Sequence, residues 1–178
     1  EDDLYDKFAN YVLGDAKLEA TEYVFVSDLF HQQYVGGAEL SMKTLIETTP
    51  GSGTLANSSM VDKEFIDFYK DSKWVFGNIA DLSSESIRHI IDSGIEYSFI
   101  EFDYKLCKHR NPILYKFVEG EECDYKATPR GKLIEEFILS SKTTFFMSDA
   151  QRKIYEAELP EVASANTHIL SSLLMITS

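Results

Sequence analysis

Short apolar runs alternate along the chain with stretches of helical spacing. Consecutive apolar positions in the runs are typical of strands buried on both faces of a parallel sheet. Apolar residues that recur every three or four positions predict amphipathic helices between them. We expect strands over residues 23–28, 73–78, 97–102, 143–148 and 167–173, and a turn with a short strand over 50–57. We expect helices over residues 2–13, 36–46, 65–72, 83–94, 132–141 and 149–159.

This alternation predicts βαβ units with right-handed crossovers and a mostly parallel sheet covered on both faces. The expected fold is an α/β, Rossmann-like three-layer α/β/α sandwich, formed as one domain over residues 1–178. Residues 1–20 form its N-terminal helical extension, and residues 103–129 form a long, polar, irregular loop of the kind that often carries function. Ser83 or Ser84 and Ser148 are expected N-caps, and Gly94 is expected to end a helix.

Composition narrows the range of partners. The formal net charge of −13 disfavours nucleic acid, although a helix N-terminus can still bind a single nucleotide. No apolar run reaches the roughly 18 residues of a membrane span, so we expect none. Two cysteines are too few for a disulfide framework, which favours a cytoplasmic setting. The chain begins without Met and ends in an apolar run, so we expect a trimmed chain or one that continues.

One candidate site follows the first predicted strand. Gly36 and Gly37 precede a predicted helix, and two glycines there allow a phosphate or a sugar to approach the backbone. In an open α/β sheet this point lies at the carboxyl end of a strand, where ligands usually bind. The alternative is a turn of positive φ before an ordinary helix. His31, in the same loop, can contact a sugar hydroxyl or act as an acid or base, or it has no role.

The order Ser27-Asp28, a loop, and Gly36-Gly37-Ala38-Glu39 resembles the opening of family 4-type glycosyltransferases of the GT-B class. In that family the glycine loop lies in the cleft between two Rossmann-like domains, near the donor's diphosphate and the acceptor. The resemblance therefore implies substrate-binding roles for Gly36, Gly37, Ala38 and Glu39.

A second segment is similar to one in the same family, where a strand ends in His-Asp and is followed by an aromatic residue, a Cys, a variable loop and a second Cys. Here the corresponding residues are Asp103, Cys107 and Cys123, with Phe102 in place of the His. The resemblance implies that Asp103 faces the acceptor and serves as the catalytic residue.

The densest basic cluster follows directly, at Lys105, Lys108, His109 and Arg110. It can bind a phosphate or an acidic sugar, and we expect Lys105 and Arg110 to contact substrate. Alternatively, these are solvated loop charges that balance the neighbouring glutamates. The cysteines have three interpretations: a disulfide, a zinc site with His109 and Asp124, or two packed thiols, which we favour. No metal and no cofactor are predicted.

Together these features predict the acceptor-side half of a hexosyltransferase-like enzyme that moves a sugar from a nucleotide-sugar donor to a hydroxyl acceptor. The expected partners are that donor, a carbohydrate or other hydroxyl acceptor, and a C-terminal domain or partner chain, because 178 residues leave no room for a second domain of about 150. Self-association into a homo-oligomer is also expected. One alternative is a non-catalytic binding or assembly domain of the same fold. Another is a flavodoxin-like domain, for which the sheet order would be 2-1-3-4-5 rather than 3-2-1-4-5-6.

Overall fold

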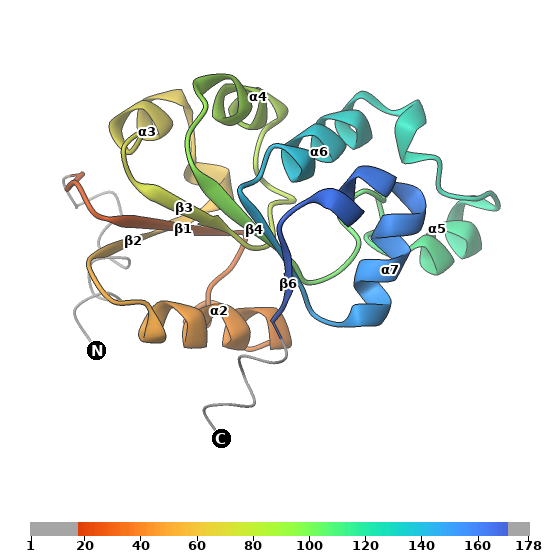
Figure 1. Ribbon diagram of the computed structural model, residues 1–178, viewed down its shortest axis with the longest axis horizontal. Coiled ribbons are helices and arrows are strands. Elements are labelled where there is room, and N and C mark those ends of the chain that lie inside the picture. The colour runs from red at the N-terminus through yellow and green to blue at the C-terminus, as the bar shows by residue number, and fades with distance from the viewer. Residues whose placement is uncertain (1–17, 171–178) are drawn as a thin grey trace. The chain divides into compact units, whose positions relative to one another are not determined.

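The computed structural model describes residues 18–170 (Figure 1). The predicted helix over residues 2–13 and the end of the last predicted strand lie outside them. Six strands form one sheet in the order β2-β1-β3-β4-β5-β6. The strands are β1 (Tyr23–Ser27), β2 (Gly53–Asn57), β3 (Lys73–Phe76), β4 (Tyr97–Glu101), β5 (Thr143–Phe146) and β6 (Thr167–Ile169). The predicted α/β fold with helices between parallel strands is confirmed.

The strand order bears on one of the alternatives. The first five strands follow 2-1-3-4-5, the order expected of the flavodoxin-like arrangement, and β6 extends the sheet beside β5. The order 3-2-1-4-5-6 is not observed. The chain divides after Tyr97 into two compact units, and each is described by itself below.

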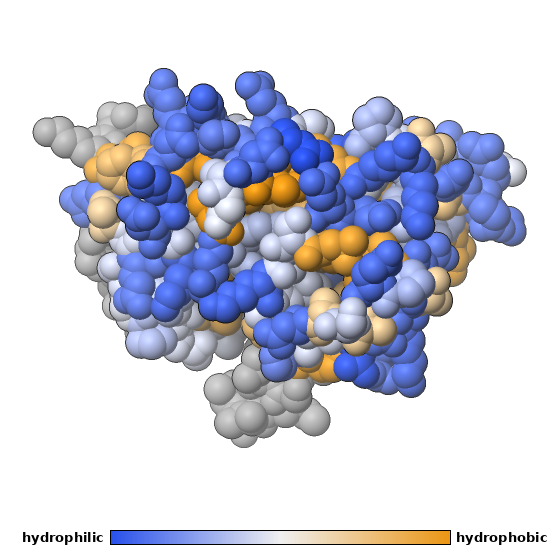
Figure 2. Space-filling view, turned by 45° about the horizontal axis from the view of Figure 1, so that its top comes forward, coloured by the Kyte–Doolittle hydropathy of each residue, from blue (hydrophilic) through white to orange (hydrophobic). Residues whose placement is uncertain are grey.

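In the first unit, β1 pairs in parallel with β2 on one side and β3 on the other. Its apolar run is buried because helices lie on both sides: Figure 1 shows α2 (Gly37–Thr48) on one side, and α3 (Lys63–Phe68) and α4 (Ser84–Ser93) on the other. Trp74 anchors an aromatic cluster against α3 and donates its indole N–H to the carbonyl of Tyr69 at 2.9 Å. The outer side of α3 and α4 is hydrophilic (Figure 2).

The helix ends in this unit follow their predicted chemistry. Gly36 is the N-cap of α2, in an extended conformation, and the glycine pair does open a helix. The Ser83 side chain caps α4, and Gly94 ends it in the left-handed conformation at φ 67°. Helix α3 is shorter than predicted, because its last turn closes at Tyr69 before a tight turn leads into β3.

The second unit contains β4, β5 and β6 with helices α5 (Pro112–Glu119), α6 (Pro129–Leu139) and α7 (Asp149–Glu158). Helix α5 lies inside the segment 103–129, which was expected to be irregular. Asn111, Pro112 and Gly120 supply the start and stop signals of α5, but eight residues give too short an apolar pattern to stand out. Short 3-10 turns occur at Ser58–Met60, Tyr125–Ala127 and Pro160–Ser164.

Candidate functional site

The strand order reverses beside β1, where α2 and α4 leave neighbouring strands toward opposite faces. Such a switch point is where open α/β sheets usually bind ligands. It lies within the first unit, and Asp28 holds its two loops together. The carboxylate of Asp28 accepts the backbone N–H groups of Ala80 at 2.9 Å and Asp81 at 3.0 Å, and the hydroxyl of Ser58 also donates to it. Asp28 was not among the predicted site residues, although a carboxylate directly after a buried strand was a usable signal.

The N-terminus of α2 forms the open part of this switch point. Within residues 18–170, no side chain caps the helix, and Gly36 provides none itself. A Cβ on Gly37 would meet no atom within 4 Å, so the space in front of it is open. The first N–H groups of α2 are therefore placed to meet a ligand.

Glu39 changes the electrostatics of this helix end. The residue is only 9% exposed, and a Cβ on Gly36 would lie 2.5 Å from its Oε2 and 2.9 Å from the Tyr34 ring. Glycine at position 36 therefore leaves room for both side chains. A carboxylate beside the first turn offsets the positive end of the helix dipole. The site consequently suits a hydroxyl group, which can both donate and accept, better than a phosphate.

Two further polar atoms near the switch point are inaccessible to water and have no hydrogen-bond partner among the described residues. They are Nδ1 of His31, in the loop after β1, and Oδ1 of Asn78, in the loop after β3. Buried polar atoms of folded proteins are generally satisfied, so unsatisfied ones near a candidate site can indicate a ligand or water. The predicted residues His31, Gly36, Gly37, Ala38 and Glu39 thus all lie on one loop and the helix start that follows it.

The second unit holds a buried charged cluster at the end of β4. Glu101 is fully buried, and Lys105, whose side chain is 4% exposed, donates to its Oε1 at 2.8 Å. The backbone N–H groups of Asp103 and Lys105 and the phenol of Tyr155 also donate to the Glu101 carboxylate. Burial raises the pKa of Glu101, while the Lys105 ammonium opposes that shift. Neither Glu101 nor Tyr155 was a predicted site residue; a glutamate within an apolar strand was the available signal.

Asp103 lies at the edge of this cluster. Its Oδ2 is 3.3 Å from Nη1 of Arg110, and its Oδ1 is 3.6 Å from Nζ of Lys105. Arg110 adopts φ 55°, an uncommon value for a non-glycine residue. The Phe102 ring lies with its centroid 5.9 Å from the Lys105 ammonium. Sequence reasoning thus predicted residues that the fold does bring together: Asp103, Lys105 and Arg110.

The other two basic residues of the cluster pair with one glutamate. Nζ of Lys108 and Nε2 of His109 lie 3.0 Å and 2.7 Å from Oε1 of Glu119. These contacts agree with the interpretation of loop charges that balance neighbouring glutamates.

The two cysteines are free. Burial, and then a hydrogen bond between the Cys123 and Cys107 thiols, raise the pKa of Cys123 to about 12, which agrees with the favoured interpretation of two packed thiols. Across the part of the chain that the structure describes, no three His, Cys, Asp or Glu side chains gather as a metal ion would require.

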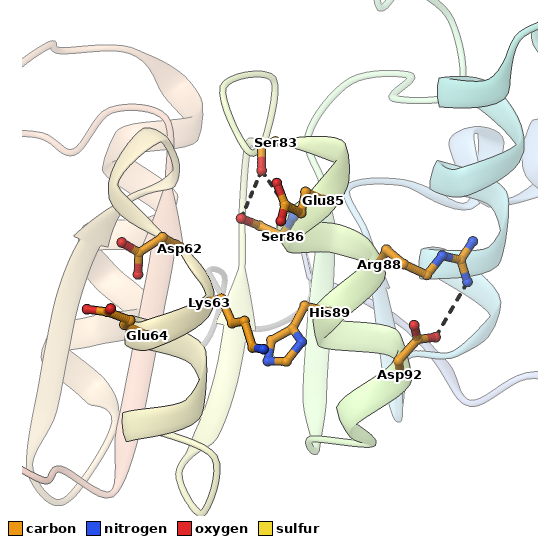
Figure 3. A pocket seen from close by; sticks show the side chains of 9 residues that line it. All are labelled: Asp62, Lys63, Glu64, Ser83, Glu85, Ser86, Arg88, His89 and Asp92. Carbon is orange, nitrogen blue, oxygen red and sulfur yellow. Dashed lines mark hydrogen bonds and ion pairs between the residues drawn. The ribbon is translucent and has the colours of Figure 1, made fainter.

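An open groove of about 480 Å³ lies between α3 and α4, away from every predicted site residue (Figure 3). The side chains of Lys63 and His89 point toward one another across it. Several of its other polar residues have local partners: Asp62 caps α3, Ser83 caps α4, and Arg88 pairs with Asp92 at 3.7 Å. The groove therefore follows from helix ends and surface pairs, and we do not assign it a ligand.

Comparison with known proteins adds no identity to this geometry. No protein-family model matches the chain, no curated protein matches it, and no solved structure matches it. None of the helices within residues 18–170 is long and apolar enough to cross a membrane. The class of protein is thus defined by its fold, an α/β protein with a parallel six-stranded sheet.

Proposed function

We propose that this chain is the acceptor-side half of a glycosyltransferase that moves a sugar from a nucleotide-sugar donor to a hydroxyl acceptor. The observation that carries the proposal is the N-terminus of α2, where open backbone N–H groups and the nearly buried Glu39 carboxylate lie side by side. A sugar hydroxyl can accept a hydrogen bond from these N–H groups and donate one to the Glu39 carboxylate.

The surroundings of this helix end suit a carbohydrate. Tyr34 is 58% exposed and lies against Gly36, where its ring can pack on the apolar face of a sugar. Pockets that combine an aromatic surface with a few placed polar groups are typical of small-molecule sites.

The same electrostatics support a donor site away from the N-terminus of α2. A nucleotide diphosphate at α2 would meet the Glu39 carboxylate and an acidic chain. The proposal therefore leaves most donor contacts to a second domain or a partner chain. Asp103 keeps its predicted catalytic role within the proposal, and Arg110, one-third exposed, is its partner toward substrate. Lys105 is too deeply buried for substrate contact, and we give it a positioning role through Glu101.

One finding favours a different function. The strand order β2-β1-β3-β4-β5 is the flavodoxin-like order, so it favours an unrelated flavodoxin-like or nucleotide-binding domain over the glycosyltransferase half. Both functions predict a ligand at α2, and they differ in turnover. A sugar-transfer assay with nucleotide-sugar and the natural full-length product separates them, because transfer that Asp103→Asn abolishes is expected only of the enzyme.

Ligand binding by the chain itself tests the site. We expect saturation-transfer NMR to detect simple sugars, and calorimetry to detect no tight binding of nucleotide-sugars. Gly37→Trp fills the open space before α2 and should abolish sugar binding. Thr48→Trp, at the far end of the same helix, is the matched control and should leave binding unchanged.

Glu39→Gln discriminates between the two ligand classes. It keeps the shape of the side chain and removes its charge, so sugar binding should weaken. If the helix end binds a diphosphate instead, the same variant should strengthen nucleotide binding. Tighter nucleotide binding by Glu39→Gln, or sub-micromolar donor binding by this chain alone, contradicts the acceptor-side assignment.

A further inference from the structure

The buried face of α2 ends in a carboxylate. Glu39, Met42 and Ile46 are the buried residues of this helix, and they recur at the spacing of one helical face. Met42 and Ile46 are 1% and 6% exposed, as core side chains are. Glu39 is 9% exposed, although glutamate is almost never fully buried unless it is paired. A charged residue therefore occupies the position on this face that lies nearest to the open helix end.

Nothing within residues 18–170 pairs with this carboxylate. No hydrogen bond or ion pair of the described residues involves the Glu39 side chain. A glutamate at the third position of a helix often accepts the N–H group of the N-cap residue, here Gly36, and that bond is not formed. Its Oε2 lies 2.5 Å from the point that a Cβ of Gly36 would occupy. Burial of an unpaired carboxylate is unfavourable, so a ligand that donates a hydrogen bond to Glu39 would stabilise this helix end.

Exposed apolar side chains border the same helix end. Tyr34, Val35 and Leu40 are 58%, 67% and 46% exposed. The Tyr34 ring lies 2.9 Å from the point that a Cβ of Gly36 would occupy, so the ring and the Glu39 carboxylate adjoin. Val35 precedes the N-cap and Leu40 is the fourth residue of the helix, two positions whose side chains commonly pack on one another. That packing accounts for an apolar residue at each position, yet both side chains keep much of their surface exposed.

These polar and apolar groups suit different parts of one ligand. The first N–H groups of α2 donate and the Glu39 carboxylate accepts, so a hydroxyl group can satisfy both. An ammonium group could satisfy the carboxylate, but it would lie at the positive end of the helix dipole and could accept nothing from the N–H groups. The exposed apolar side chains are stabilised by contact with an apolar group and not by a further hydroxyl. The ligand that fits has a hydroxyl-bearing part and an apolar part.

The extent of the apolar surface indicates a small molecule. Its three side chains all fall within residues 34–40, whereas a protein interface takes about 20–30 residues from each side. An alkyl chain or an aromatic ring is large enough to cover them. The apolar surface and the unpaired carboxylate also adjoin the same glycine, so one bound molecule can reach both.

We propose that the acceptor carries an apolar group beside the hydroxyl that α2 binds, so that the acceptor is an alkyl or aryl glycoside and not a free sugar. The inference rests on the proposed function, because it concerns the acceptor site of that enzyme. In this arrangement Glu39 and the first N–H groups of α2 bind the hydroxyl. The side chains of Tyr34, Val35 and Leu40 cover the apolar group.

Binding of paired glycosides to the full chain tests the acceptor class. The probes are the methyl and hexyl glycosides of glucose, galactose and mannose, titrated by saturation-transfer NMR below the concentration at which hexyl glycosides form micelles. We expect at least one hexyl glycoside to bind about tenfold more tightly than its methyl counterpart, a factor that corresponds to burial of roughly two methylene groups. Glu39→Gln should weaken both members of that pair by about tenfold, because both donate a hydrogen bond to the carboxylate.

Leu40→Gln reports the apolar contact. It keeps the length and the helix propensity of the side chain and makes its end polar, so the preference for the hexyl glycoside should fall from about tenfold to about threefold. Leu139→Gln is the matched control, because Leu139 is 37% exposed at the end of α6 and lies outside the proposed site. It should keep the full preference. A folding defect would weaken both members of a pair and leave their ratio unchanged, so the ratio reports the surface and not the fold.

The possible failures are distinguishable. If methyl and hexyl glycosides bind equally, the inference is overturned while the proposed acceptor site stands, and the exposed apolar side chains are assigned to a protein partner. A preference for hexyl glycosides that Leu40→Gln leaves unchanged also overturns the inference, because the alkyl chain then binds elsewhere. If no glycoside of either kind binds, both the inference and the proposed acceptor site are contradicted.

Discussion

Lys105→Met removes the cation from the buried cluster at the end of β4 and keeps a flexible side chain of similar length. The Glu101 carboxylate, fully buried and 2.8 Å from the ammonium, then loses its compensating charge. Breaking a buried ion pair on one side typically costs about 3–5 kcal/mol, because the remaining charge stays desolvated. Against a total stability of about 5–15 kcal/mol, this is a large fraction.

The assay is equilibrium unfolding in urea, followed by far-UV circular dichroism. With a slope of about 2 kcal/mol per molar urea, the midpoint should fall by roughly 2 M. The double variant Glu101→Gln/Lys105→Met removes both charges and retains an amide oxygen for the surrounding donors. It should recover a large part of the loss. With Glu101→Gln measured alone to complete the cycle, the coupling free energy should be at least about 2 kcal/mol.

Lys108→Met is the control, because Lys108 is an exposed lysine three positions further on that pairs with Glu119 at the surface. Its midpoint should change little. The reasoning is refuted if Lys105→Met costs less than about 1 kcal/mol, or if the single and double variants show no coupling. Either result would mean that the ion pair between Lys105 and Glu101 contributes little to stability.

Three further variants test other contacts. Tyr155→Phe should cost about 1.5–3 kcal/mol in urea unfolding, because it removes a donor to Glu101. Burial raises the pKa of Tyr155 above its usual 10.0, so the folded protein holds the phenol proton where the unfolded chain releases it. The free energy of unfolding of the wild type should therefore fall above about pH 10, and its excess over that of Tyr155→Phe should become smaller. An excess that stays constant with pH contradicts the raised pKa of Tyr155. Asp28→Ala should lower the free energy of unfolding by about 1–3 kcal/mol, since two backbone N–H groups lose their acceptor. An unchanged melting temperature would contradict the role of Asp28 in holding the two loops together. Gly131→Ala should lower the free energy of unfolding by about 1–3 kcal/mol, because its Cβ would clash with the backbone carbonyl oxygen of Tyr125. Gly37→Ala is the control and should cost less than about 1 kcal/mol, because a Cβ on Gly37 meets no atom within 4 Å.

Local sequence signals predicted most of the fold. The consecutive apolar residues of β1 can be satisfied only by burial on both faces, and Ser83 and Gly94 bound α4 through their own chemistry. Helix α5 escaped prediction although its cap residues were visible, because its eight residues give too short an apolar pattern to stand out.

The candidate residues were predicted more reliably than their roles. Asp103, Lys105 and Arg110 do lie together, since they belong to one short loop after a strand. The loop also buries Lys105 against Glu101, and this turns an expected substrate contact into an internal ion pair. Spacing along the chain gives proximity, whereas burial depends on what packs above the loop, here Tyr155 from α7.

The sequence by itself determined the alternation of elements, the helix caps and the places where polar residues follow buried strands, because these depend on neighbours within a few positions. Only the tertiary structure decided the strand order, the hydrogen bonds by which Asp28 joins two loops, and the burial of the Glu101–Lys105 pair. Each of these joins segments that are distant in sequence or depends on a distant segment for its burial. Their energy comes from desolvation and hydrogen bonds that exist only once the chain has packed.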